Sequence, residues 1–342
     1  MMGRVASVAL AGIAAVVLAP AVAAQSAPRS VVPIREVDIR PIGTPRYAIE
    51  VVVNGTPMLA GLDTGSTGLR LLPRAAALAR IAPGGEPERY DYGSGVLLDG
   101  HQARADVAIG GARSMVTVQA VDRVGCNARK PDCPASHLAP ADYGLMGSGQ
   151  AGQGFPAIIG IRLDAGRVGN PLPRMGVHRW IVHLPQRGGG GGTLILNPDA
   201  RDTAGFVPLR AGAANAHGTV AGCVALALPG ARQACGPTLF DTGAPGITVL
   251  HADRPPAWQP GRRARLLLDP AQGGRSPVVG FVTGDQAHGA NTSFQPEAGS
   301  QTVVHAGTLP FYAFDVLFDA DSTMIAVRPN PDAGPSTVPL SN

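Results

Sequence analysis

Short apolar runs, separated by glycine and proline, recur along the whole chain. Residues 47–53 form the first clear run, and the hairpin-type dipeptide Asn54-Gly55 separates it from a second run at residues 58–62. Comparable runs follow at residues 105–109, 114–121, 180–184, 193–196, 224–228, 238–240, 264–268, 278–282 and 314–318. Helical periodicity is confined to residues 71–81, with one further turn at residues 310–314. The pattern predicts an all-β protein.

Residues 1–24 have the pattern of a signal peptide. Arg4 precedes an apolar run at residues 5–18, and the small residues at 21–24 offer a cleavage site before Gln25. The apolar run is too short to favour a helix that spans a membrane. We therefore expect an exported protein, periplasmic or secreted, with no stable insertion into a membrane.

The length of 342 residues favours two domains or one large domain. Five consecutive glycines at residues 188–192 cannot hold regular structure cheaply, so they mark either a junction or the tip of a hairpin. We place a flexible lead-in at residues 25–36, an N-terminal lobe at 37–185, a C-terminal lobe at 186–328 and a loose tail at 329–342.

Charged side chains are sparse and dispersed. They make up 15% of the chain, the net charge is +4, and Lys130 is the single lysine. No basic run resembles a phosphate-binding stripe, so a nucleic-acid partner is not expected. The glycine run at 188–192 lacks the Gly-Lys-Ser/Thr of a phosphate loop, and the chain has neither a Gly-x-Ser-x-Gly elbow nor a His-Glu-x-x-His motif.

The four cysteines form two local pairs. Cys126 lies near Cys133, and Cys223 lies near Cys235, on either side of the turn residues Pro229-Gly230. In an oxidising compartment this arrangement predicts two small disulfide loops. A zinc site is the alternative, but the pairs lack Cys-x-x-Cys spacing and no histidine stands at a matching offset. We expect no metal.

The most informative feature is an internal repeat. The stretch Leu62-Asp63-Thr64-Gly65-Ser66-Thr67-Gly68-Leu69-Arg70-Leu71-Leu72 aligns without gaps to Phe240-Asp241-Thr242-Gly243-Ala244-Pro245-Gly246-Ile247-Thr248-Val249-Leu250, 178 residues later. A single Asp-Thr-Gly is a common turn. Two copies, each between apolar strands and each in its own half of the chain, indicate a shared function.

The repeated residue types suit one kind of chemistry. An aspartate between buried strands is costly unless its charge is hydrogen-bonded, and Gly65 and Gly243 would let backbone amides approach the two carboxylates. The hydroxyls of Thr64 and Thr242 could lock each loop to its counterpart. If the halves meet about a pseudo-twofold axis, the two carboxyl groups share one proton. Such a pair can activate a water molecule and protonate a substrate carbonyl without a cofactor.

The two motifs differ at their fourth position. The Ser66 hydroxyl can donate a hydrogen bond to the carboxylate of Asp63, whereas Ala244 offers no such donor to Asp241. Because donors to the ionised form lower the pKa of an acid, we expect Asp63 to carry the charge and Asp241 the shared proton.

At these residues the chain resembles the pepsin-like aspartic peptidases. Tyr92-Gly93-Ser94-Gly95 is similar to the tip of that family's flap, with Tyr92 at the flap tyrosine. Gly144-Leu145-Met146-Gly147 is similar to the segment that completes the first loop around its Asp, and residues 311–319 are similar to the C-terminal strand. The resemblance covers residues 37–328. Arg70 stands where the family has a supporting Trp, and His305-Ala306-Gly307 matches poorly in the second half.

The resemblance implies a bilobal fold of two β-barrel-like lobes with a cleft between them. It implies an aspartic endopeptidase that acts on a peptide or protein substrate as a monomer, with Asp63 and Asp241 as its catalytic pair. The supporting loop residues are Thr64, Gly65, Ser66, Thr242, Gly243 and Ala244.

Two alternatives remain open from the sequence. The first is a catalytically inactive binding protein that uses the same cleft to hold a peptide or another ligand. The second is a structural or interaction module of the cell envelope. Both aspartates are retained, which favours the enzyme, because an inactive relative would be expected to lose one.

Overall fold

The computed structural model describes residues 26–39, 44–164, 166–185, 187–212, 218–296, 299 and 301–334. In this part of the chain the regular structure is mostly β-strand, arranged in two sheets, which confirms the all-β prediction. The helices are short: α1 (Pro73–Leu78), α2 (Pro171–Arg174), α3 (Leu309–Ala313) and the 3₁₀ turn η1 (Gln286–His288). None of these helices is long and apolar enough to cross a membrane. The predicted signal peptide at residues 1–24 lies outside the described residues.

The larger sheet has 13 strands in the order β11-β20-β19-β9-β10-β1-β2-β3-β8-β4-β7-β6-β5. Their bounds are β1 (Ser30–Ile39), β2 (Thr44–Val53), β3 (Thr56–Asp63), β4 (Thr67–Leu71), β5 (Pro87–Asp91), β6 (Val96–Ile109), β7 (Ala112–Cys126), β8 (Ala157–Ile161), β9 (Arg179–His183), β10 (Gly192–Leu196), β11 (Val207–Pro208), β19 (Phe314–Asp319) and β20 (Met324–Pro329). The hairpin between β2 and β3 turns at Asn54-Gly55, where both residues have positive φ, as the sequence predicts.

The smaller sheet has seven strands in the order β16-β15-β12-β13-β18-β14-β17. Their bounds are β12 (Thr219–Leu226), β13 (Gln233–Phe240), β14 (Ile247–Leu250), β15 (Arg263–Leu268), β16 (Val278–Val282), β17 (Thr292–Gln295) and β18 (Val303–Gly307). Apolar side chains of both sheets and of the short helices form one large buried cluster, which includes Tyr47, Trp180, Phe240 and Phe311.

A five-strand arrangement occurs once in each sheet. In the larger sheet β2-β3-β8-β4-β7 pair in the sequence antiparallel, parallel, antiparallel, parallel. In the smaller sheet β12-β13-β18-β14-β17 pair in the same sequence of directions. β3 and β13 each lead into one Asp-Thr-Gly motif, so the repeat in the sequence is matched by a repeat in the topology.

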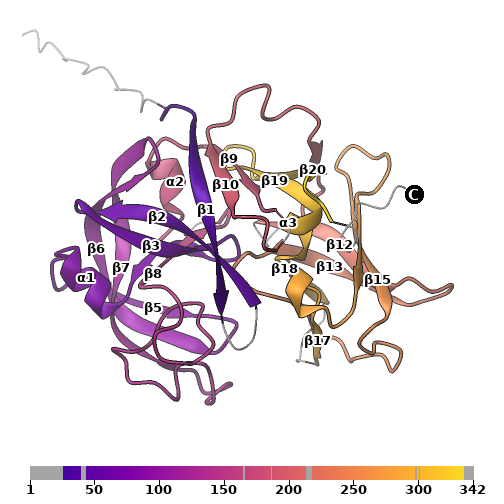
Figure 1. Cartoon of the computed structure of the whole chain (residues 1–342), viewed down its shortest axis with the longest axis horizontal. Helices are drawn as coiled ribbons and strands as arrows, with labels where there is room; N and C mark the ends of the chain where they lie inside the picture. The colour runs from indigo at the N-terminus through magenta and orange to yellow at the C-terminus, as the bar shows by residue number, and fades with distance from the viewer. Residues whose placement is uncertain are drawn as a thin grey trace, which may run out of the picture.

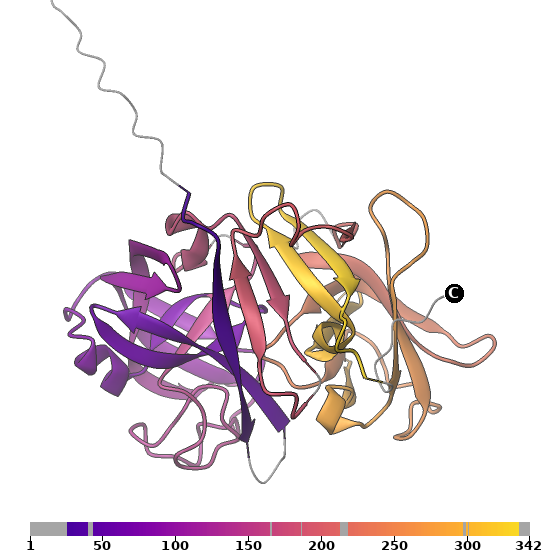
Figure 2. The same ribbon diagram turned by 45° about the horizontal axis from the view of Figure 1, so that its top comes forward.

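Strands from distant parts of the chain lie between the two halves. Figures 1 and 2 show β1, the β9–β10 hairpin and the β19–β20 hairpin side by side, with the indigo and purple half on one side and the orange half on the other. The glycine run at 188–192 therefore belongs to the tip of the β9–β10 hairpin. The two strands that flank the predicted boundary, β9 and β10, pair with each other in the larger sheet.

The two ends of the described chain differ from the sequence-based prediction. The lead-in expected to be flexible at residues 25–36 forms strand β1 from Ser30 onward, paired with β10 and β2. The tail expected to be loose begins in β20, and Asn330 is buried, where its amide donates to the carbonyls of Leu184 and Phe311. Strand pairing at one end and the Asn330 side chain at the other thus tie both ends to the rest of the structure. Residues 335–342 of the tail lie outside the described part.

Candidate active site

Each repeated aspartate stands at the end of a buried strand. Asp63 is the last residue of β3, and Asp241 directly follows β13. The preceding residues, Leu62 and Phe240, are almost fully buried and anchor the two strand ends in the core. The chain turns directly after each strand, so both carboxyl groups lie where a strand meets a loop.

The two motifs are joined by reciprocal hydrogen bonds. The backbone amide of Thr64 donates to Oγ1 of Thr242 over 3.1 Å, and the amide of Thr242 donates to Oγ1 of Thr64 over 3.0 Å. The Thr64 hydroxyl donates to the carbonyl of Phe240 over 2.9 Å, and the Thr242 hydroxyl donates to the carbonyl of Leu62 over 2.6 Å. All four bonds are buried, so they hold the two loops in one fixed arrangement.

The glycines of the motifs allow the two carboxyl groups to approach. A Cβ added to Gly243 would lie 2.9 Å from Oδ1 of Asp63 and 3.0 Å from Oδ1 of Asp241, so a single point touches both groups. A Cβ added to Gly65 would collide with the carboxyl group of Asp241. The structure therefore brings Asp63 and Asp241 together, and any side chain at either glycine would separate them.

The hydrogen bonding of the two aspartates is unequal. Asp63 accepts from the amides of Gly65 and Ser66 over 2.8 and 3.0 Å, and from the Ser66 hydroxyl over 2.6 Å. Asp241 accepts one backbone bond, from the amide of Gly243 over 2.8 Å. Three donors stabilise a negative charge on Asp63 more strongly than one donor does on Asp241.

The electrostatic surroundings favour the protonated form of Asp241. Deep placement among protein atoms, followed by the charge of the neighbouring Asp63, raises the pKa of Asp241 well above its ordinary value. The Gly243 amide and the Arg46 guanidinium act against this rise. A charged Asp63 beside a protonated Asp241 is the arrangement expected from the difference between Ser66 and Ala244.

The segment that closes the first loop is not the one predicted from the sequence. Gly144-Leu145-Met146-Gly147 was expected there, but the position beside Asp63 belongs to β8, where Gly160 pairs with Asp63 and with Gly68. In the second half Gly307 of β18 pairs with Phe240 and accepts from the amide of Asp241 over 3.1 Å. Ile158-Ile159-Gly160 and His305-Ala306-Gly307 are therefore the matching segments.

The expected flap is the turn between β5 and β6. The amide of Tyr92 donates to the carbonyl of Val96, and the amide of Gly95 donates to the carbonyl of Tyr92. Tyr92 lines the cavity beside the aspartates, and its hydroxyl is buried without a hydrogen-bond partner among the described residues. Gly93 lies at the tip, where no atom would meet an added Cβ within 4 Å.

Arg70 takes the space beneath this turn. Its guanidinium carbon lies 3.5 Å from the centre of the Tyr90 ring, and the rings of Tyr90 and Tyr92 are 4.7 Å apart, edge to face. A cation over an aromatic face is attracted by the ring quadrupole. Arg70 and Tyr90 thus support Tyr92, a pairing that no pattern in the sequence predicts.

Both predicted disulfides are present. Cys126 and Cys133 are bonded with their Cα atoms 5.6 Å apart, and Cys223 and Cys235 are bonded across β12 and β13. The loop closed by Cys126 and Cys133 also contacts the turn between β5 and β6, because the amide of Asn127 donates to the carbonyl of Gly95 over 2.8 Å. The Lys130 ammonium donates to the carbonyl of Gly93 over 2.6 Å.

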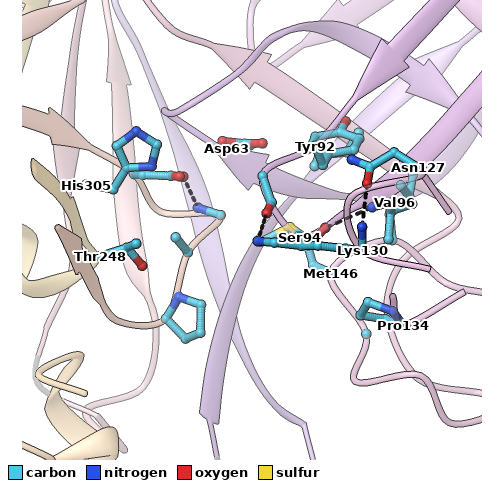
Figure 3. A pocket seen from close by; sticks show the side chains of 18 of the residues that line it. Asp63, Tyr92, Ser94, Val96, Asn127, Lys130, Pro134, Met146, Thr248 and His305 are labelled. Atoms are coloured by element: carbon cyan, nitrogen blue, oxygen red, sulfur yellow. Dashed lines mark hydrogen bonds between the residues drawn. The ribbon is translucent and has the colours of Figure 1, made fainter. Parts of the chain in front are cut away.

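A cavity of about 540 Å³ opens above the two aspartates. Figure 3 looks into it, with Asp63 between Thr248 and His305 on one side and Tyr92, Ser94 and Lys130 on the other. The walls thus come from both halves of the chain. Such a volume is in the range of pockets that bind small-molecule ligands.

Three residues at this site escaped the sequence analysis: Arg46, Tyr90 and Lys130. The signals were faint, since Tyr90 lies two positions before the flap tyrosine and Lys130 is the only lysine. The sequence around Arg46 does not indicate a site, because a charged residue at the start of an apolar strand is normally solvated. The pairing of β2 with β3, which ends at Asp63, brings Arg46 to the aspartates.

No protein-family model matches the chain, and no curated protein matches its sequence.

Proposed function

We propose that this protein is an aspartic endopeptidase, with Asp63 and Asp241 as its catalytic pair. The observation that carries the proposal is the close approach of two carboxyl groups on either side of Gly243, delivered by two copies of one motif and fixed by reciprocal Thr64–Thr242 hydrogen bonds. Two carboxyl groups that face each other across a buried site do not both ionise readily, so they hold one proton between them. The resemblance of the motifs to the pepsin-like aspartic peptidases supports the same conclusion.

The unequal hydrogen bonding assigns a role to each member of the pair. The Asp63 carboxylate, held by Gly65 and Ser66, removes a proton from a water molecule that lies between the carboxyl groups. The water oxygen forms a bond to the peptide carbonyl carbon, while protonated Asp241 gives its proton to the carbonyl oxygen. A tetrahedral diol results, and the negative charge has passed from Asp63 to Asp241.

The second half of the reaction returns the pair to its starting state. The proton on Asp63 passes to the peptide nitrogen, and a proton from a diol hydroxyl returns to Asp241. The C–N bond then breaks, which releases a carboxylic acid and an amine. Atoms and charge balance without a metal ion or a covalent intermediate, and no oxidant or reductant is required.

The remaining architecture suits an extended chain as substrate. In the proposed bilobal fold, the cavity between the halves is the substrate cleft, and the turn at residues 92–95 is the flap. A hairpin that closes over the substrate excludes water and strengthens the interactions of charged groups. Two disulfides and the resemblance to a secretory signal peptide at residues 1–24 favour action outside the cytoplasm.

The direct test is proteolysis by the purified chain lacking residues 1–24. A denatured protein substrate is incubated at several acidic and neutral pH values, with and without pepstatin, and products are identified by mass spectrometry. We expect pepstatin-sensitive cleavage that falls by several orders of magnitude in Asp63→Asn and in Asp241→Asn, because the pair acts as one unit. Circular dichroism checks that both variants are folded.

Two experimental outcomes would contradict the proposal. Near-normal cleavage by either folded variant would remove Asp63 and Asp241 from catalysis. Peptide binding without any cleavage, in a chain that is folded at every pH tested, would favour a binding protein that uses the same cleft.

A further inference from the structure

Arg46 lies in β2 and lines the cavity that contains Asp63 and Asp241. Its Nε donates to the carbonyl of Met146 over 2.8 Å. Its Nη1 is buried and has no hydrogen-bond partner among the described residues. A buried donor without a partner costs free energy comparable to a lost hydrogen bond, so a ligand that accepts from it recovers that cost.

The guanidinium is held in place before any ligand arrives. Met146, whose carbonyl accepts from Arg46, has a positive φ of 62° and belongs to the segment 144–147. Its side chain packs on Gly61 so closely that a Cβ added there would collide with the sulfur. This packing fixes the backbone that orients Arg46, which reduces the entropy lost when a ligand binds.

The charges around the cavity are complementary to an acidic ligand. Among the described residues that line it, Arg46, Arg129 and Lys130 are basic, and the two aspartates are the only acids. Because the aspartates hold one proton between them, together they contribute about one negative charge. The cavity therefore carries an excess of positive charge toward any peptide in it.

We infer that Arg46 is a specificity-determining residue that binds an aspartate or glutamate side chain of the substrate. The inference rests on the proposed peptidase function and adds the substrate class. A carboxylate matches the planar guanidinium and can accept two parallel hydrogen bonds, whereas the uncharged amide of glutamine cannot accept both. We expect Arg46 to bind the acidic side chain at one position of the substrate, while Asp63 and Asp241 perform the chemistry.

The experiment compares pairs of peptides that differ only by glutamate or glutamine. A library places the pair at each position around the cleaved bond, and the readout is the ratio of kcat/KM for the glutamate peptide to that for the glutamine peptide. The wild type should give a ratio on the order of 10- to 100-fold at one position, which corresponds to charge-assisted hydrogen bonding. Arg46→Gln should reduce that ratio to near one.

Matched variants separate recognition from folding and from general electrostatics. Arg46→Lys keeps the charge and should retain part of the ratio, and Arg46→Glu should favour lysine at the same position. Arg35→Gln removes an exposed arginine outside the cavity and should leave the ratio unchanged. Thermal melting shows which variants are folded.

Several results would overturn the inference. An unchanged ratio in folded Arg46→Gln, or loss of the ratio in Arg129→Gln instead, would place recognition elsewhere. If the only effect of Arg46→Gln were an equal shift in the pH dependence of kcat/KM for all peptides, Arg46 would act on the aspartates and not on the substrate.

A binding measurement keeps this test independent of catalysis. Fluorescence anisotropy with Asp63→Asn should show tighter binding of the labelled glutamate peptide than of the glutamine peptide, and Arg46→Gln in that background should abolish the difference. If the wild type cleaved no peptide but this difference held, the peptidase function would fail and the acidic specificity would stand. If the wild type cleaved peptides but preferred glutamate at no position, the acidic specificity would fail and the peptidase function would stand.

Discussion

The side chain of Thr64 and that of Thr242 each bind the backbone of the other's loop, over 3.0 and 3.1 Å, across a separation of 178 residues. Each hydroxyl also donates to the carbonyl that precedes the opposite aspartate. Each threonine thus makes the same two kinds of hydrogen bond to the opposite loop. The two loops behave as one unit, whose geometry depends on both halves of the chain.

Replacement of either threonine by valine should destabilise the protein and reduce activity. Thr242→Val keeps the shape of the side chain but removes the hydroxyl that accepts from the Thr64 amide and donates to the Leu62 carbonyl. A buried group left unsatisfied costs about 1–3 kcal/mol, so chemical denaturation should show a loss of about that size. The two substitutions should be non-additive in a double-mutant cycle because they remove one shared network.

The control for this prediction is Thr193→Val, on a half-buried position of β10. If Thr64→Val and Thr242→Val cost no more than this control, the reciprocal hydrogen bonds do not hold the loops together.

The Cys126–Cys133 loop should affect catalysis more than the Cys223–Cys235 loop does. Both loops are short, so each disulfide should contribute at most about 2–3 kcal/mol to the free energy of unfolding. Only the first carries Asn127 and Lys130, which bind the turn at residues 93–95. The double replacement of Cys126 and Cys133 by serine should therefore lower kcat/KM, per folded molecule, more than the same change at Cys223 and Cys235. Equal effects on kcat/KM would mean that the loop does not position the flap.

Much of this site follows from local sequence. Two Asp-Thr-Gly motifs between apolar strands indicate where the carboxyl groups lie, and Ser66 against Ala244 predicts their unequal hydrogen bonding. The disulfide pairs follow from spacing alone, because Cys223 and Cys235 lie on either side of a turn.

Other features depend on contacts that no local pattern contains. Gly144–Gly147 and Ile158–Gly160 both offer apolar residues before a glycine, and only the pairing of β8 with β3 and β4 decides between them. β1 contains Pro33 and pairs with two strands, but residues 30–34 pair with β10 and residues 35–39 pair with β2, so Pro33 has a partner strand on one side only. The place of β1 was not predictable, because partners 160 residues away supply the hydrogen bonds.

Tyr92→Phe should retain stability, because the removed hydroxyl has no hydrogen-bond partner among the described residues. Burial raises the pKa of Tyr92 well above its ordinary value, so the hydroxyl stays protonated at acidic and neutral pH. If that hydroxyl donates to a bound substrate, kcat/KM falls on the order of 10-fold while the melting temperature stays the same. A lower melting temperature with unchanged kcat/KM would indicate a tyrosine that only packs against its neighbours.

The cluster around His183 should make stability depend on pH. His183 Nδ1 lies 2.7 Å from Oδ1 of Asp315, which also pairs with Arg328, and this hydrogen bond raises the pKa of His183. Because the raised pKa belongs to the folded state, the stabilisation is fully present below the unfolded value of about 6.5 and is lost as pH rises through the folded value. The melting temperature of the wild type should fall over that range more than that of His183→Gln. Parallel curves for the two proteins would exclude this contribution.

The two aspartates differ in the number of hydrogen bonds that their carboxyl groups accept. Asp241 accepts one backbone hydrogen bond, and burial and the charge of Asp63 raise its pKa well above the ordinary value. Ala244→Ser supplies a hydroxyl equivalent to that of Ser66, which donates to Asp63 over 2.6 Å. A donor to the ionised form lowers the upper pKa of the coupled pair.

The alkaline limb of kcat/KM should therefore move to lower pH in Ala244→Ser, by about one unit at most, because one hydrogen bond to a charge supplies little more than that. Ser66→Ala removes the matching donor from Asp63, so its acid limb should move to higher pH. The two profiles are measured with one peptide, and folding is checked at each pH. Since the shifts have opposite signs, a general loss of activity cannot imitate them. An alkaline limb that stays in place or moves upward in Ala244→Ser would show that the missing hydroxyl does not set the protonation of Asp241.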